Sequence, residues 1–193
     1  DLHPRVRRQR QMCIRDSAKA LNRKAHIVVD EVNASVRPLK ERFYTNDYDD
    51  DMLVSGEEAV RLVDETTLLV IVDVNKGEHT ECPELIELAQ SIVVIDHHRQ
   101  AGDAIAKAVL FYIEPYASSA SEMVAEICQY IGGGLKLRAA EAEALYAGVM
   151  IDTNYFTDKT GVRTFEAMAY LKRNGADSVS YTHLRAHETC ADL

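Results

Sequence analysis

The chain has 193 residues, of which 47% are hydrophobic and 27% charged, so it is long enough for one globular domain with a sizeable core. A formal net charge of −9 disfavours general nucleic-acid binding through a basic surface. No apolar run approaches the roughly 18 residues of a membrane span, and the four cysteines lack the Cys-x-x-Cys spacing of zinc sites.

The two ends of the chain lack the periodicity of its middle. Residues 1–16 hold five arginines and two acids without a helical or strand pattern, and the pattern of the middle breaks off after Asp177. Both end segments resemble translated sequencing-adaptor sequence; for the first, the alternative is a basic tail that binds anions. We therefore expect a domain over residues 17–178 and disordered flanks over 1–16 and 179–193.

Between these ends, apolar strands alternate with helices. Apolar runs predict strands at 25–29, 52–54, 68–72, 92–95 and 108–113, and helical patterns predict helices after Ser55, over 84–89, from Ser119 to Tyr130, from 138 to 152 and from 163 to 174. The spacing of Ser55 and Glu58 is typical of a capping box at a helix start. Strand, helix and strand joined by short loops favour an α/β fold, a parallel β-sheet with helices on both faces.

Three of the apolar runs end in acids. Asp73 closes the run at 68–72, the triplet Asp96-His97-His98 follows the run at 92–95, and Asp152 closes a third run. A lone Asp or His is commonly a satisfied core or surface residue, but three ionisable residues together at a strand end favour a ligand site. Carboxylates and imidazoles suit Mn²⁺ and similar ions, and a metal offsets the repulsion between acids. We expect the Asp73 and His97 side chains within about 8 Å of each other, since a metal pair is held roughly 4 Å apart.

These motifs, in this order, resemble the DHH phosphoesterase family. The resemblance covers roughly Ala18 to Asp177 and is carried by Asp73, Asp96-His97-His98 and Gly148-Val-Met-Ile-Asp152-Thr153. Within the family, Tyr112-Ile-Glu-Pro-Tyr-Ala-Ser-Ser119 and Thr160-Gly-Val-Arg-Thr-Phe165 are similar to the GdpP-type cyclic-di-AMP phosphodiesterases. The resemblance implies a hydrolase that uses two Mn²⁺ ions to convert cyclic-di-AMP to linear pApA.

The resemblance also implies roles for individual residues. Asp73 matches a ligand that bridges the two metals, and His97 and Asp152 match ligands of the second ion. Asp96 would orient His97 or its neighbours without binding a metal ion itself. His98 matches the catalytic imidazole that reaches the substrate phosphate, as hydrogen-bond donor or general acid.

Three further residues, Ser118, Ser119 and Arg163, fall in stretches that match the family. The resemblance implies substrate binding for all three. The local pattern offers a second interpretation, in which one of the serines is a helix N-cap and Arg163 forms a salt bridge.

One family motif is missing from the sequence. The family begins with a strand followed by His-x-x-x-Asp-x-Asp, which supplies three further metal ligands, and this motif occurs nowhere in the 193 residues. The resemblance therefore implies an N-terminally truncated domain, inactive by itself and without the family's C-terminal substrate domain. For the parent protein it implies a cyclic-dinucleotide substrate, a homodimer, and attachment to the bacterial cell membrane with this domain on the cytoplasmic side.

Two other functions stay open at this point. One is the same chemistry on short oligonucleotides or pyrophosphate, although the Glu-Pro-Tyr-Ala-Ser-Ser stretch at 114–119 favours the cyclic dinucleotide. The other is a degenerate, metal-free domain used for binding or regulation. The presence of Asp73, His97, His98 and Asp152 together argues against such decay.

Overall fold

A computed structural model of the protein describes Ile14, Ala18 and residues 23–29, 52–100, 105–131 and 136–177. Of the two predicted flanks, 1–16 and 179–193, only Ile14 lies within the described residues, where it is partly buried against two hydrophobic clusters. The rest of both flanks, and the predicted domain bounds at residues 17 and 178, lie outside them.

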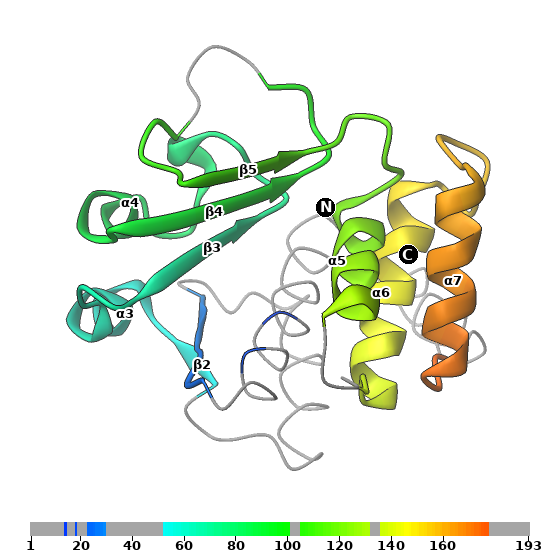
Figure 1. The fold of residues 1–193 in the computed structure, drawn as a ribbon, viewed down its shortest axis with the longest axis horizontal. Coiled ribbons are helices and arrows are strands. Elements are labelled where there is room, and N and C mark those ends of the chain that lie inside the picture. The colour runs from blue at the N-terminus through cyan, green and yellow to red at the C-terminus, as the bar shows by residue number, and fades with distance from the viewer. Residues whose placement is uncertain are drawn as a thin grey trace, which may run out of the picture.

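The larger of two sheets has three parallel strands (Figure 1). They are β3 (Leu68–Val72), β4 (Ser91–Asp96) and β5 (Leu110–Ile113), with β4 in the middle. β1 (Ile27–Val28) and β2 (Leu53–Val54) pair in parallel as a separate sheet, so the described residues hold two parallel sheets where the sequence suggested one. β2 is short because a helix cap, Ser55, follows it directly.

The middle strand is buried on both faces, as the unbroken apolar run at 92–95 predicted. Ile92, Val94 and Ile95 are all buried, although they alternate between the two faces. The register pairs Val72 with Ile95, so β3 and β4 reach the same edge of the sheet together.

Helices connect the strands and cover the larger sheet. They are α3 (Gly56–Leu62), the 3₁₀ turn η1 (Gly77–His79), α4 (Glu84–Leu88), α5 (Ala120–Tyr130), α6 (Ala139–Asp152) and α7 (Val162–Arg173). Each α-helix was predicted, and the predicted bounds differ from the observed ones by at most one residue. No helix within the described ranges is both long and apolar enough to span a membrane.

The two faces of the β3–β4–β5 sheet are covered by different helices. On one face, Ile71 and Ile92 pack in a cluster with Ile86 of α4. On the other face, Ile95 packs with Met123 of α5, and α5, α6 and α7 stand side by side beyond it (Figure 1). The predicted α/β fold with helices on both faces of a parallel sheet is therefore confirmed.

The predicted capping box of α3 is also present. The Ser55 hydroxyl accepts a hydrogen bond from the Glu58 amide at 3.2 Å, and the Ser55 amide donates to the Glu58 carboxylate at 2.9 Å. The bond from the Ser55 amide, followed by the bond from its hydroxyl, lowers the pKa of Glu58 from its usual 4.5. The reciprocal bonds explain why the helix begins at this residue.

The lowered pKa of Glu58 makes the contribution of this cap depend on pH. It is fully present above pH 4.5, the usual value, and is lost as the pH falls through the lower value of the folded state. Ser55→Ala should therefore lower the thermal midpoint at pH 7, and the gap to the wild-type chain should narrow below pH 4.5. Circular-dichroism melts at pH 7 and pH 3.5 check this, and a gap equal at both values would contradict the reciprocal cap.

Candidate metal centre

The candidate centre lies where β3 and β4 end. Asp73 directly follows β3, and its amide donates to the Ile95 carbonyl at 2.8 Å, which fixes it beside the end of β4. Its backbone has φ of 68°, in the left-handed region that few residues other than glycine adopt, but which Asp and Asn tolerate better than most. The side chain is only 3% exposed. A carboxylate is thus held, largely out of water, at the carboxyl edge of the sheet.

Two imidazoles join this carboxylate. The His97 Nε2 atom lies 3.5 Å from the Asp73 Oδ1 atom, well inside the expected separation. The rings of His97 and His98 lie with their centroids 4.4 Å apart. One ligand atom of each of the three residues lies within 4.8 Å of the others, and this is the only such group of three or more His, Cys, Asp or Glu in the described part of the chain.

Asp96 orients His98. Its Oδ1 atom lies 2.7 Å from His98 Nδ1 and accepts the His98 amide at 3.2 Å. A carboxylate only accepts hydrogen bonds, so the His98 Nδ1 atom is the donor in this pair. Asp96 is fully buried, whereas 52% of the His98 side chain is exposed. The neighbour that Asp96 orients is therefore His98 rather than His97.

A further residue, Asn75, supports the same loop. It is 6% exposed and its amide nitrogen donates to the His98 carbonyl at 3.4 Å. Asn75 was not among the predicted site residues, although a polar residue two positions after Asp73 at a strand end was a usable signal.

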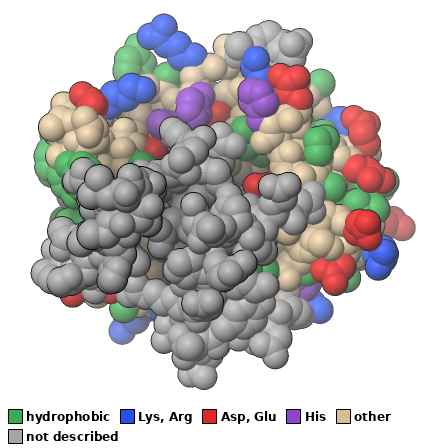
Figure 2. Space-filling view, turned by 180° about the vertical axis from the view of Figure 1, so that it is seen from behind, with side chains coloured by type: hydrophobic (Ala, Val, Ile, Leu, Met, Phe, Trp, Pro, Cys, Tyr) green, Lys and Arg blue, Asp and Glu red, His purple; other side chains and the backbone are tan. Residues whose placement is uncertain are grey.

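The two histidines of the group differ in exposure. Histidine side chains are visible at the top of one face of the molecule, with both acidic and basic side chains nearby (Figure 2). His98 is the more open of the two ring residues in the group. A ligand approaching from solvent therefore meets His98 before it meets Asp73.

Asp152 is not among these converging ligand atoms. It is the last residue of α6 and is half-buried. The turn after it is unusual, because Asn154, Tyr155 and Phe156 have φ of 45°, 57° and 66°. Consecutive left-handed residues other than glycine are strained. Thr153 holds this turn through its hydroxyl, which donates to Val149 and accepts from the Phe156 amide.

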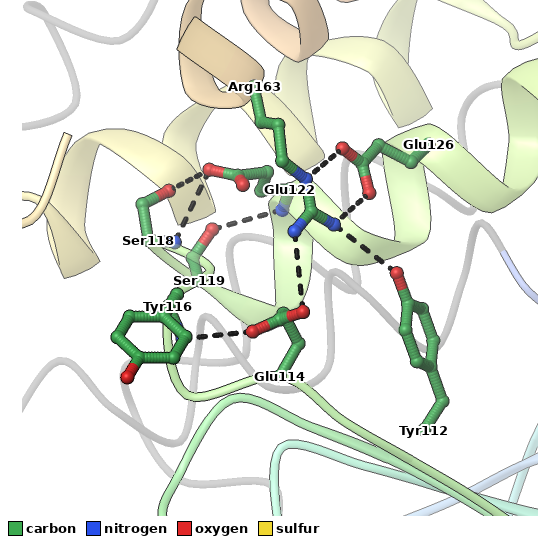
Figure 3. Close-up of polar contacts among 8 residues, drawn as sticks. All are labelled: Tyr112, Glu114, Tyr116, Ser118, Ser119, Glu122, Glu126 and Arg163. Carbon is green, nitrogen blue, oxygen red and sulfur yellow. Dashed lines mark hydrogen bonds and ion pairs between the residues drawn. The ribbon is translucent and has the colours of Figure 1, made fainter. Parts of the chain in front are cut away.

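The two candidate serines lie at the start of α5 (Figure 3). Ser119 is the N-cap, and its hydroxyl accepts a hydrogen bond from the Glu122 amide at 3.0 Å. Ser118 donates both its hydroxyl and its amide to the Glu122 carboxylate. All three residues are at most 1% exposed. The N-cap interpretation is confirmed; Glu122, which sequence analysis missed, was signalled by its Ser-x-x-Glu spacing.

Arg163, near the start of α7, lies in an ion-pair network (Figure 3). Its guanidinium forms two hydrogen bonds with the Glu126 carboxylate, at 2.8 and 2.6 Å, and lies 3.6 Å from the Glu114 carboxylate. The hydrogen bonds to Glu126 raise the pKa of Arg163 above its ordinary value. The salt-bridge interpretation of Arg163 is thus confirmed.

Comparison with known proteins places these features in a family. The family model described as "DHH family, N-terminal domain" matches residues 13–149. "Cyclic-di-AMP phosphodiesterase GdpP" of Bacillus subtilis (strain 168) is 40% identical over 164 residues, which are 84% of this chain and 25% of that protein. The protein of the same name from Geobacillus thermodenitrificans (strain NG80-2) is 45% identical over 126 residues, 65% of this chain and 19% of that protein. The chain thus spans a quarter or less of the length of these relatives.

One further relative by sequence and one solved structure are also similar to this chain. A "Probable manganese-dependent inorganic pyrophosphatase" of Thermotoga maritima is 35% identical over 99 residues, 51% of this chain and 18% of that protein. The crystal structure of an exopolyphosphatase-related protein from Bacteroides fragilis matches with a TM-score of 0.72 at 19% identity, over 90% of this chain and 50% of that one. At this identity the structural match shows the fold alone.

The cap at the start of α5 gives a stability prediction. Ser119→Ala removes the oxygen that accepts the buried Glu122 amide, so the free energy of unfolding should fall by about 1–2 kcal/mol in a urea titration of the chain. Ser119→Thr keeps an accepting oxygen and serves as the control. Equal unfolding free energies for the wild-type and Ala chains would show that the hydroxyl does not cap the helix.

Proposed function

The chain belongs to the DHH family, and from this premise we propose that the protein containing it is a manganese-dependent phosphodiesterase that hydrolyses cyclic-di-AMP to linear pApA. Two relatives, at 40% and 45% identity, are named cyclic-di-AMP phosphodiesterases. The observation that carries the proposal is the convergence of Asp73, His97 and His98 at the carboxyl ends of β3 and β4. Ligands bind at this edge in open parallel sheets.

The residues that converge fit a divalent cation. A carboxylate and imidazoles are ligand types that suit Mn²⁺, and a bound cation would offset part of the cost of burying the Asp73 charge. We assign Asp73 as the bridge between two ions, and His97 and Asp152 as ligands of the second. The assignment of Asp152 rests on its sequence motif alone. When bound, the ions would supply Lewis acidity toward the phosphodiester and an activated water.

His98 is the proposed catalytic residue. Asp96 holds the Nδ1 side of the His98 ring, and 52% of the His98 side chain is exposed. We assign Nε2 as the atom that donates a hydrogen bond or a proton to a phosphate oxygen of the substrate. Asp96 acts as a positioning residue, because its carboxylate is buried and contacts the Nδ1 atom of the His98 ring. Substrate contacts by Ser118 and Ser119 belong to the same proposal, although both hydroxyls already serve the start of α5.

The 193 residues alone should bind metal weakly and turn over no substrate. Two divalent ions need more ligands than the three side chains that converge in the described residues. We further propose that the whole protein is a homodimer attached to the cell membrane, with this domain on its cytoplasmic side. Because no turnover is expected of the chain alone, activity assays use the whole protein.

The substrate is tested by a three-way assay of the whole protein with Mn²⁺. Cyclic-di-AMP should be converted to pApA with a kcat/KM well above that for a short linear oligonucleotide or for pyrophosphate. Pyrophosphate is the informative competitor, because one relative is named for that activity. Preference for pyrophosphate or the oligonucleotide would replace the proposed substrate, and no Mn²⁺-dependent hydrolysis of any of the three would remove the enzyme proposal.

The metal assignment is tested by Asp73→Asn. Asn also tolerates the left-handed backbone of this position, so the fold should persist while the charge shared by the ions is lost. In the whole protein, kcat should fall by at least about a hundredfold, a typical scale for losing a positioned electrostatic group. In the 193-residue chain, Mn²⁺ affinity measured by calorimetry should fall by about tenfold or more.

The exposed Asp158 offers a matched control, because Asp158→Asn removes one acid outside the converging group. It should leave both Mn²⁺ affinity and kcat unchanged. Near-normal activity of the Asp73→Asn protein at saturating Mn²⁺ would show that Asp73 does not bridge the ions.

A further inference from the structure

The guanidinium of Arg163 is almost fully occupied by the protein itself (Figure 3). Nε and one terminal nitrogen bind the two oxygens of Glu126, and that terminal nitrogen also reaches the Tyr112 hydroxyl at 3.3 Å. The other terminal nitrogen lies 3.6 Å from Glu114. Planar, two-point pairing of Arg with a carboxylate is the strongest form of such a contact.

This occupancy leaves little for a substrate phosphate. A guanidinium that recognises phosphate needs two parallel N–H groups free to face it. Here the fork faces Glu126, and a second carboxylate lies on its other side, so two negative charges surround one positive charge. The local charge would repel a phosphodiester rather than attract it.

The same contacts lead from α7 toward the candidate centre. Glu114 follows β5, and its amide donates to the Asp96 carbonyl at 3.0 Å. Asp96 in turn holds His98 at 2.7 Å. Tyr112 gives a second link, because it pairs with Ile95 in the sheet, one residue before Asp96. Arg163 therefore contacts Tyr112 in β5 and Glu114 directly after it. These are the positions at which the chain pairs with the end of β4.

We propose that Arg163 is a positioning residue for the reaction: its clamp on Glu126, Glu114 and Tyr112 fixes the end of β5 and, through the Glu114–Asp96 hydrogen bond, the Asp96–His98 pair. This role replaces a direct substrate contact for Arg163. It rests on the proposed function for its kinetic consequence, whereas its structural consequence does not depend on any activity.

The kinetic test uses Arg163→Gln and Glu126→Gln in the whole protein. A clamp needs both partners, so each variant should lower kcat by about tenfold, the scale of a lost charge-assisted hydrogen bond, with KM within about twofold of wild type. The double variant should be no worse than either single one, since both changes break one contact. If Arg163 instead bound the substrate phosphate, Arg163→Gln would raise KM. Glu126→Gln would free the guanidinium and would not lower kcat. Observing both results would overturn the proposal.

Arg61→Gln is the matched control, because Arg61 pairs with Glu57 at 3.5 Å on the exposed surface of α3. It should change neither kcat nor KM. Circular-dichroism melts of all variants separate loss of the clamp from loss of the fold, and Glu126→Gln keeps the test decisive if Arg163→Gln fails to fold.

A second readout applies to the 193-residue chain and needs no substrate. Hydrogen exchange at the Glu114 amide, which is bonded to Asp96, should accelerate by about tenfold in both clamp variants and stay unchanged in Arg61→Gln. Unchanged exchange in both clamp variants would overturn the proposal. If the wild-type protein hydrolyses no cyclic-di-AMP, the proposed function fails and the exchange measurement alone decides the clamp.

Discussion

The structure depends on the burial of two carboxylates at one edge of a parallel sheet. Asp73 is 3% exposed and Asp96 is fully buried, and each terminates or directly follows a strand. Removing such charges from water is costly, so each needs a partner with which to share its charge. His98 lies 2.7 Å from Asp96, and His97 lies 3.5 Å from Asp73. Asp73 and His97 thus bring a carboxylate oxygen and an imidazole nitrogen together at one strand end, and these are ligand types that suit a divalent cation.

Packing around the sheet explains why these groups hold their positions. The apolar residues of β4 are buried from both faces, so the strand cannot slide without exposing one set of its side chains. The register then fixes Asp96 opposite Ile113 and next to Glu114. Glu114 in turn pairs with Arg163, which lies near the start of α7. The contacts that pack the sheet are therefore linked to the residues of the proposed chemistry.

Much of this was visible in the sequence, because the signals are local. The unbroken run at 92–95 predicted a strand buried on both faces, and Ser55 with Glu58 predicted a helix start. The nearness of Asp73 and His97 followed from the rule that parallel strands share a carboxyl edge. A salt bridge of Arg163 was expected, but its partner was not predictable, since Glu126 lies 37 positions away in the chain and only tertiary packing brings the two together. The separate β1–β2 sheet was missed for the same reason.

The proposal that Asp73 and His97 bind a manganese ion can be tested by diffraction from crystals of this chain grown with Mn²⁺, with data collected on both sides of the manganese absorption edge. We expect an anomalous peak in contact with the Asp73 carboxylate and the His97 Nε2 atom, beside the exposed ring of His98. A peak only elsewhere on the molecule, or none at saturating Mn²⁺ with the two side chains in place, would contradict it.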